Sequence, residues 1–85
     1  MNKRPKDGTL EDISDEVCSA RTKFPGNAKL LAALTEEVGE LAQAMLQRKS
    51  AQYIYKEAKQ VACVAIRIME EGDSDFELDN WDSSS

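Results

Sequence analysis

Apolar residues recur at spacings of three and four along three segments of the chain, which is the pattern of amphipathic helices. The predicted helices run from about 9 to 23, from about 28 to 49, and from about 51 to 71. Thr9, Asn27 and Ser50 are the predicted N-caps of these helices, and Gly72 ends the third. No segment shows the alternation of a strand. The sequence therefore predicts an all-α fold, a small helical bundle of about three helices.

The predicted helices define one domain with a polar segment at each end. Residues 9–72 form the expected helical domain. Residues 1–8 are polar and contain Pro5 and Gly8, so we expect a flexible N-terminus. Residues 73–85 are acidic and serine-rich, which predicts a mobile tail. A chain of 85 residues has room for a limited core, and oligomerisation is a common remedy.

The residue inventory narrows the function classes. The chain has 16 acidic and 11 basic residues and no basic stripe, so a nucleic-acid polymer is not an expected partner. It has no histidine, which leaves oxygen-ligated cations such as Mg²⁺ as the best-matched metals. Two cysteines make no disulfide framework and favour a cytoplasmic setting. The sequence has no long apolar run, so we expect no membrane association.

Two glutamates fall on the apolar sides of the second and third predicted helices when each is drawn as a wheel of about 100° per residue. The apolar arc of the second helix consists of Leu30, Leu34, Val38, Leu41 and Met45. Glu37 lies inside this arc and Glu40 at its edge. On the third helix, Glu57 lies inside the apolar arc and Gln60 at its edge. Residues three apart on a helix are neighbours, so each pair can converge on one point.

A divalent cation shared by these carboxylates would explain why they face the apolar side of each helix. An unpaired buried carboxylate costs several kcal/mol or becomes protonated, and facing carboxylates repel each other. Mg²⁺ takes oxygen ligands and commonly holds substrate phosphates. We therefore predict a Mg²⁺ site at Glu37, Glu40 and Glu57, with Gln60 offering an amide oxygen. The alternative is that these are ordinary solvated glutamates, which is the preferred interpretation for Glu36 from its wheel position alone.

The two segments "EEVGELAQAML" and "KEAKQVACVAIRI" resemble the MazG-like members of the all-α nucleoside triphosphate pyrophosphohydrolase superfamily. That family carries E-E-x-x-E on one helix and E-x-x-D on the next. Here the first motif spans Glu36 to Glu40 and the second begins at Glu57, with sixteen residues between Glu40 and Glu57. The resemblance covers about Phe24 to Gly72.

The resemblance implies a fold, a reaction and residue roles. The implied fold is a helical bundle completed by a homodimer or, as a dimer of dimers, a homotetramer. The implied reaction is hydrolysis of a nucleoside triphosphate to its monophosphate and pyrophosphate, with Mg²⁺ or alternatively Mn²⁺, in house-cleaning or control of the nucleotide pool. By position, Glu37, Glu40 and Glu57 would bind metal, and Glu36 would assist through a second metal or by orienting water.

Gln60 stands where the family pattern has Asp, and it brings no charge. This substitution supports a second hypothesis, a non-catalytic MazG-like module that binds nucleotide or a protein partner. A third is a structural helical oligomer whose carboxylates have no ligand.

Five further residues are candidates for contact with the nucleotide. Cations for the phosphates are Arg67, Lys56 and Lys59, and aromatic side chains for stacking on the base are Tyr53 and Phe24. Arg67 is the preferred cation because its wheel position adjoins Gln60. For the lysines the alternative is solvation, and for the aromatic residues it is packing in the core or at a dimer interface.

Overall fold

The computed structural model describes residues 3–76, and these residues form three α-helices, one short 3-10 helix and no strand. The helices are α1 (Asp7–Lys23), α2 (Leu30–Leu46) and α3 (Ala51–Glu71), followed by η1 (Ser74–Phe76). The predicted all-α, three-helix fold is therefore confirmed. Most of the predicted tail, 77–85, and residues 1–2 of the predicted flexible N-terminus lie outside the described residues.

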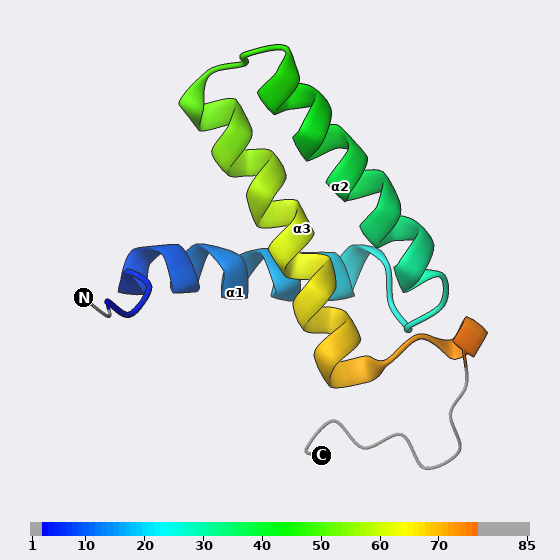
Figure 1. Cartoon of the computed structure of the whole chain (residues 1–85). Helices are drawn as coiled ribbons and strands as arrows, with labels where there is room; N and C mark the ends of the chain where they lie inside the picture. The colour runs from blue at the N-terminus through cyan, green and yellow to red at the C-terminus, as the bar shows by residue number, and fades with distance from the viewer. Residues whose placement is uncertain (1–2, 77–85) are drawn as a thin grey trace.

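The central element is α3, because both other helices pack against it. The helices α2 and α3 run side by side in opposite directions, and α1 crosses α3 (Figure 1). The backbones of α1 and α2 do not come into contact with each other. The three helices therefore form two packed pairs that share α3, and α1 and α2 diverge around it.

The ends of α3 are set by local signals that the sequence contains. Ser50 is its N-cap, and the Ser50 hydroxyl accepts a hydrogen bond from the backbone N–H of Tyr53 at 3.1 Å. Gly72 follows the last turn with a φ of 68°, a left-handed value that favours glycine. Both predicted boundaries of this helix are confirmed.

The start of α2 differs from the prediction. Asn27 is not its N-cap, and the helix begins at Leu30 after Lys29, which has a left-handed φ of 62° and makes no side-chain cap. The cap comes from beyond α3, where the Asp73 carboxylate accepts a hydrogen bond from the backbone N–H of Leu31 at 2.7 Å. Asn27 instead donates its side-chain amide to the carbonyl oxygen of Glu71 at 2.7 Å. A cap supplied from a distant segment satisfies the helix without a local capping residue.

Two other predicted boundaries also shift. The first helix begins at Asp7, so Asp7 and Gly8 are helical and Thr9 lies inside the helix rather than at its cap. The second helix ends at Leu46, whereas the sequence predicts an end at about Lys49. Arg48, two residues after Leu46, has a left-handed φ of 55°, which does not continue a helix.

The core of the single chain is small. The buried apolar residues are Val17, Leu30, Ala44 and Cys63. Two members of the apolar arc predicted for α2 stay largely exposed, Val38 at 46% and Met45 at 58%. The apolar arc of α2 is therefore wider than the face that α3 covers, and completion of the bundle by a second copy stays a prediction.

An ionic network fixes the 24–26 turn to α3. The buried Arg67 donates from Nη2 to the carbonyl oxygens of Phe24 at 2.9 Å and Gly26 at 2.6 Å. Glu71 accepts hydrogen bonds from Arg67 at 3.4 Å and from Arg21 on α1 at 2.7 Å. Burial alone would raise the pKa of Glu71, but these two arginines outweigh it and lower the pKa. Arg67 thus holds the 24–26 turn against α3, and its counterion Glu71 binds Arg21 of α1.

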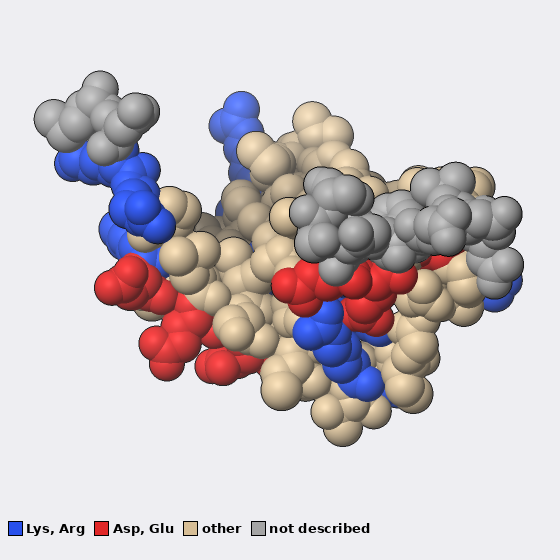
Figure 2. All heavy atoms as spheres, turned by 90° about the horizontal axis from the view of Figure 1, so that it is seen from below, with Lys and Arg blue, Asp and Glu red and all other residues tan. Residues whose placement is uncertain are grey.

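The surface charges are mixed on the face viewed from below. Lysine and arginine side chains adjoin acidic ones there, and the described residues of this face form no continuous basic field (Figure 2). Within residues 3–76, none of the helices combines the length and the apolar character needed to cross a membrane.

Candidate functional site

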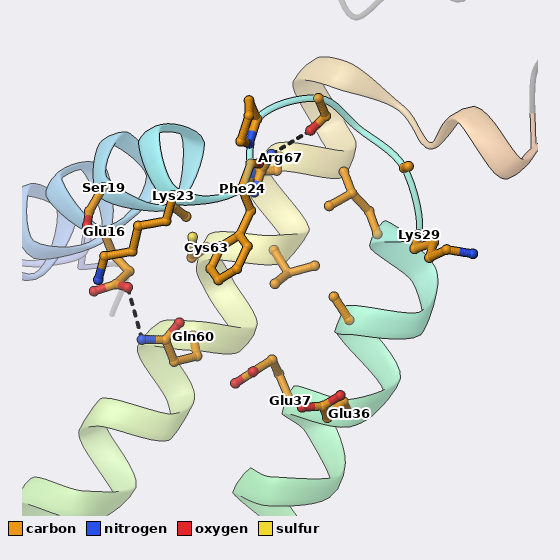
Figure 3. A pocket seen from close by; sticks show the side chains of 17 residues that line it. Glu16, Ser19, Lys23, Phe24, Lys29, Glu36, Glu37, Gln60, Cys63 and Arg67 are labelled. Carbon is orange, nitrogen blue, oxygen red and sulfur yellow. Dashed lines mark hydrogen bonds between the residues drawn. The ribbon is translucent and has the colours of Figure 1, made fainter.

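A cavity of about 480 Å³ is lined by residues of α1, α2 and α3, and the 24–29 turn lines one end of it. Its wall includes the apolar residues Leu30, Ala33, Cys63 and Val64. Glu36 and Glu37 lie at one end, and Phe24 and Arg67 lie at the end formed by the turn (Figure 3). The cavity therefore has an acidic end, an apolar wall and an end that carries an aromatic ring.

Three carboxylates converge at the acidic end. Glu36, Glu37 and Glu40 each contribute one carboxylate oxygen to a group whose members all lie within 4.8 Å of one another. Their spacing on α2 causes this, since Glu40 is four residues after Glu36 and three after Glu37. The predicted convergence of Glu37 and Glu40 on one point is therefore present, and Glu36, which the wheel placed further out, joins them. Oxygen donors at this spacing are of the type that binds hard divalent cations.

Glu57 approaches this group of carboxylates from α3. It is 6% exposed, so its inward position on the wheel is confirmed. It is not one of the three carboxylates within the 4.8 Å group, and neither Glu57 nor Glu40 lines the cavity, but the charge of Glu57 acts on Glu37 and Glu40. The pKa of Glu40 is raised by loss of solvation and then by the negative charges of Glu57 and Glu36.

Glu37 is the least satisfied of the four glutamates. Its Oε2 atom is buried and has no hydrogen-bond partner within the described part of the chain. Its pKa is raised, first by burial and then by the charges of Glu40 and Glu57. Within residues 3–76, no lysine or arginine forms an ion pair with Glu36, Glu37, Glu40 or Glu57. The acidic end thus concentrates negative charge that the described chain does not neutralise.

Gln60 lies at the cavity but is bound to a residue that the sequence prediction missed. Its Nε2 donates to Oε2 of Glu16 on α1 at 3.0 Å, and both residues line the cavity (Figure 3). A sequence signal for Glu16 exists, because it lies three residues after Ile13 and four before Ala20 on the apolar side of α1. The tertiary crossing of α1 over α3 is what brings it to this site.

The five nucleotide-contact candidates separate into two groups. Phe24 and Arg67 line the cavity, whereas Lys56, Lys59 and Tyr53 do not. Phe24 is 69% exposed, so its ring is open to stacking. Arg67 has Nε and Nη2 engaged by Glu71 and the 24–26 turn, which gives it a structural task, and its contact with a phosphate stays a prediction.

The other three candidates lie outside the cavity of Glu36 and Glu37. Lys59 lies 3.7 Å from a Glu16 oxygen, and the Lys56 ammonium lies 5.8 Å from the centre of the Tyr53 ring. Tyr53 lines a separate cavity of about 90 Å³ on the Glu40 side, with Lys49. Lys23 and Lys29 line the cavity of Glu36 and Glu37, and the sequence prediction missed both.

Comparisons with family models, with curated proteins and with solved structures found no match to this chain.

Proposed function

We propose that the chain is a Mg²⁺-dependent nucleoside triphosphate pyrophosphohydrolase, which converts a (d)NTP to its monophosphate and pyrophosphate. The main support is the convergence of Glu36, Glu37 and Glu40 beside the buried Glu57, with one buried carboxylate oxygen left without a partner. Oxygen-only donors match Mg²⁺, with Mn²⁺ as the alternative. The cavity volume of about 480 Å³ falls within the range of about 300–1,000 Å³ that is usual for small-molecule sites.

Each residue has a defined task in the proposed reaction. Glu37, Glu40 and Glu57 would hold the cation, and Gln60 would add its amide oxygen. A bound Mg²⁺ would supply charge neutralisation on the phosphates and a lowered pKa for bound water. Glu36 is exposed, which suits a group that accepts a hydrogen bond from the attacking water and orients it. The water oxygen would attack the α-phosphorus and lose its proton to the solvent, and the bond from that phosphorus to the bridging oxygen would break to release pyrophosphate.

The opposite end of the cavity suits the remainder of a nucleotide. The exposed Phe24 ring offers a stacking surface for a planar base. Lys23 and Lys29 add positive charge to the lining of this cavity. A nucleoside triphosphate would match both ends of the cavity. Its polyphosphate binds divalent cations, and its base is aromatic.

The test is pyrophosphate release from a panel of common and damaged (d)NTPs with Mg²⁺ or Mn²⁺. Glu37→Ala and Glu57→Ala should abolish release, because each removes one proposed metal ligand. Glu11→Gln is the matched control, since it removes one exposed carboxylate from α1 that does not line the cavity. Absence of release by the wild-type chain across the whole panel would overturn the proposed reaction.

One observation favours the alternative of a non-catalytic module. Gln60 adds no negative charge to the proposed metal site, and its amide nitrogen is already bound to Glu16. In that case calorimetry would detect nucleotide binding, while the pyrophosphate assay would detect no turnover. The third hypothesis, a structural oligomer, predicts neither binding nor turnover.

A further inference from the structure

The three converging carboxylates are shared between two cavities. Glu36 and Glu37 line the cavity of about 480 Å³, whereas Glu40 lines the separate cavity of about 90 Å³. One oxygen of each carboxylate lies within 4.8 Å of the others, so the group joins the two spaces. The larger cavity contains the exposed Phe24 ring, and the smaller one contains Lys49. A cation held by the three carboxylates would therefore face both cavities.

Local backbone contacts place Lys49 and Tyr53 at the smaller cavity. The 47–50 turn joins α2 to α3 at the end of this helix pair that lies away from α1 (Figure 1). In this turn the backbone N–H of Lys49 donates to the carbonyl oxygen of the buried Ala44 at 3.0 Å. The Ser50 hydroxyl caps the start of α3 and accepts from the backbone N–H of Tyr53 at 3.1 Å. The backbone of both residues is therefore fixed at the cavity.

Two lysine side chains lie over the ring of Tyr53. The ammonium of Lys49 is 5.9 Å from the ring centre and that of Lys56 is 5.8 Å from it, both within the range of a cation–π contact. Among residues 3–76, neither ammonium forms an ion pair with a carboxylate. Lys49 lines the same cavity as Glu40 without pairing with it. The ring thus holds positive charge near the carboxylates and leaves it available to an anionic ligand.

We infer that Lys49, held by Tyr53 and supported by the charge of Lys56, binds the β- and γ-phosphates of the nucleotide, which leave as pyrophosphate. This inference rests on the proposed function, because it places the leaving group of that reaction. Mg²⁺ is commonly held by one or two carboxylates together with substrate phosphates, and lysine is a common phosphate ligand. With the base at Phe24 and the cation at the carboxylates, the phosphate chain runs toward the smaller cavity. A nucleoside monophosphate lacks both of these phosphates and a diphosphate lacks one, so the contact favours triphosphates.

The experiment measures binding by calorimetry, in the presence of Mg²⁺, with inorganic pyrophosphate and separately with AMP, GMP, CMP and UMP. Lys49→Gln should weaken pyrophosphate binding about tenfold and monophosphate binding by less than about twofold, because only pyrophosphate reaches Lys49. Phe24→Ala should show the reverse pattern. Lys6→Gln is the matched control, since it removes an exposed lysine that lines neither cavity, and it should change both affinities by less than about twofold.

Two further variants separate a phosphate contact from a purely structural role. Lys49→Arg keeps the charge, so it should retain the affinity for pyrophosphate within about threefold. Tyr53→Leu removes the ring but neither lysine, and it should weaken pyrophosphate binding by about two- to fivefold, which is the effect of an exposed cation–π contact. Lys49 and Tyr53 are both exposed, so we expect these variants to fold, and circular dichroism melts in EDTA check this.

The outcomes distinguish this inference from the proposed function. If the wild type does not bind pyrophosphate, or binds it no more tightly than Lys49→Gln does, Lys49 does not hold the leaving group. Equal weakening of pyrophosphate and monophosphate binding in Lys49→Gln would overturn the inference as well. The proposed function survives these results when the wild type still releases pyrophosphate from a (d)NTP. If binding of pyrophosphate depends on Lys49 but no (d)NTP is hydrolysed, the phosphate site stands and the proposed reaction is overturned.

Discussion

The substitution Glu37→Gln should stabilise the chain in metal-free buffer and remove most of its response to Mg²⁺. Glu37 has a buried oxygen without a partner and lies beside other carboxylates, whose charges raise its pKa after the larger effect of burial. An unsatisfied buried acceptor costs about 1–3 kcal/mol. Because Glu37 is only partly buried, we expect a gain near the lower end, about 1 kcal/mol after solvent screening. For a domain of this size that corresponds to about 4–8 °C in melting temperature.

The pH dependence of this gain has a definite sign. A carboxyl group whose pKa is raised on folding contributes stability that is fully present below its ordinary value of 4.5 and is lost as pH rises through the raised value. Glu37→Gln removes this loss, so the difference in melting temperature between the variant and the wild type should grow as pH rises from about 4 to 7. Groups with lowered pKa values, such as Glu71, affect both proteins equally and cancel in the difference.

The assay is a set of circular dichroism melts at several pH values, with EDTA and with Mg²⁺. A cation that binds only the folded wild type raises its stability by about 2.7 kcal/mol at a concentration of 100 times Kd. Glu37→Gln should lose most of this rise. Two results would refute the reasoning: a variant that melts below the wild type in EDTA at pH 7, or a difference that stays constant with pH. Equal responses of both proteins to Mg²⁺ would remove Glu37 from the metal site.

Three further predictions follow from contacts elsewhere in the fold. Asp73→Ala should lower stability by about 1 kcal/mol in urea unfolding, because it removes the carboxylate that caps α2 at Leu31; Ser74→Ala nearby is the control, and equal effects would contradict a capping role. Arg67→Met should lower the free energy of unfolding by about 3 kcal/mol, because it leaves two carbonyl oxygens and Glu71 without their buried cation. A loss under about 1 kcal/mol would show that the turn is stable without Arg67. Phe24→Ala should raise KM for the nucleotide with little change in melting temperature, because the ring is 69% exposed and lines the cavity; an unchanged KM would exclude stacking on Phe24.

The parts of the fold that the sequence predicts correctly depend on local signals. The limits of α3 follow from Ser50 and Gly72, which act on their own neighbours. The convergence of Glu37 with Glu40 follows from helical spacing alone, whereas the wheel placed Glu36 further out than its observed position beside them. These features need no knowledge of how the helices pack.

The parts that sequence reasoning misses depend on tertiary contacts. Asp73 caps α2 from beyond α3, so the local rule chooses Asn27 as the cap instead. Glu16 reaches Gln60 only because α1 crosses α3, and no periodicity within α1 specifies that crossing. Sequence reasoning also misses the structural contacts of Arg67, since its partners Phe24 and Gly26 belong to the turn before α2.

The distribution of ion pairs supports a ligand site more strongly than the number of acidic residues does. At the turn end of the cavity, Arg67 and Arg21 neutralise Glu71, although its partial burial would otherwise raise its pKa. At the opposite end, the described chain provides no such cation for Glu37 or the buried Glu57. A chain under pressure for stability alone gains by pairing buried charges or by replacing them with apolar groups. The described chain pairs such charges where they hold the turn and leaves Glu37 and Glu57 unpaired, and the proposed cation would neutralise them.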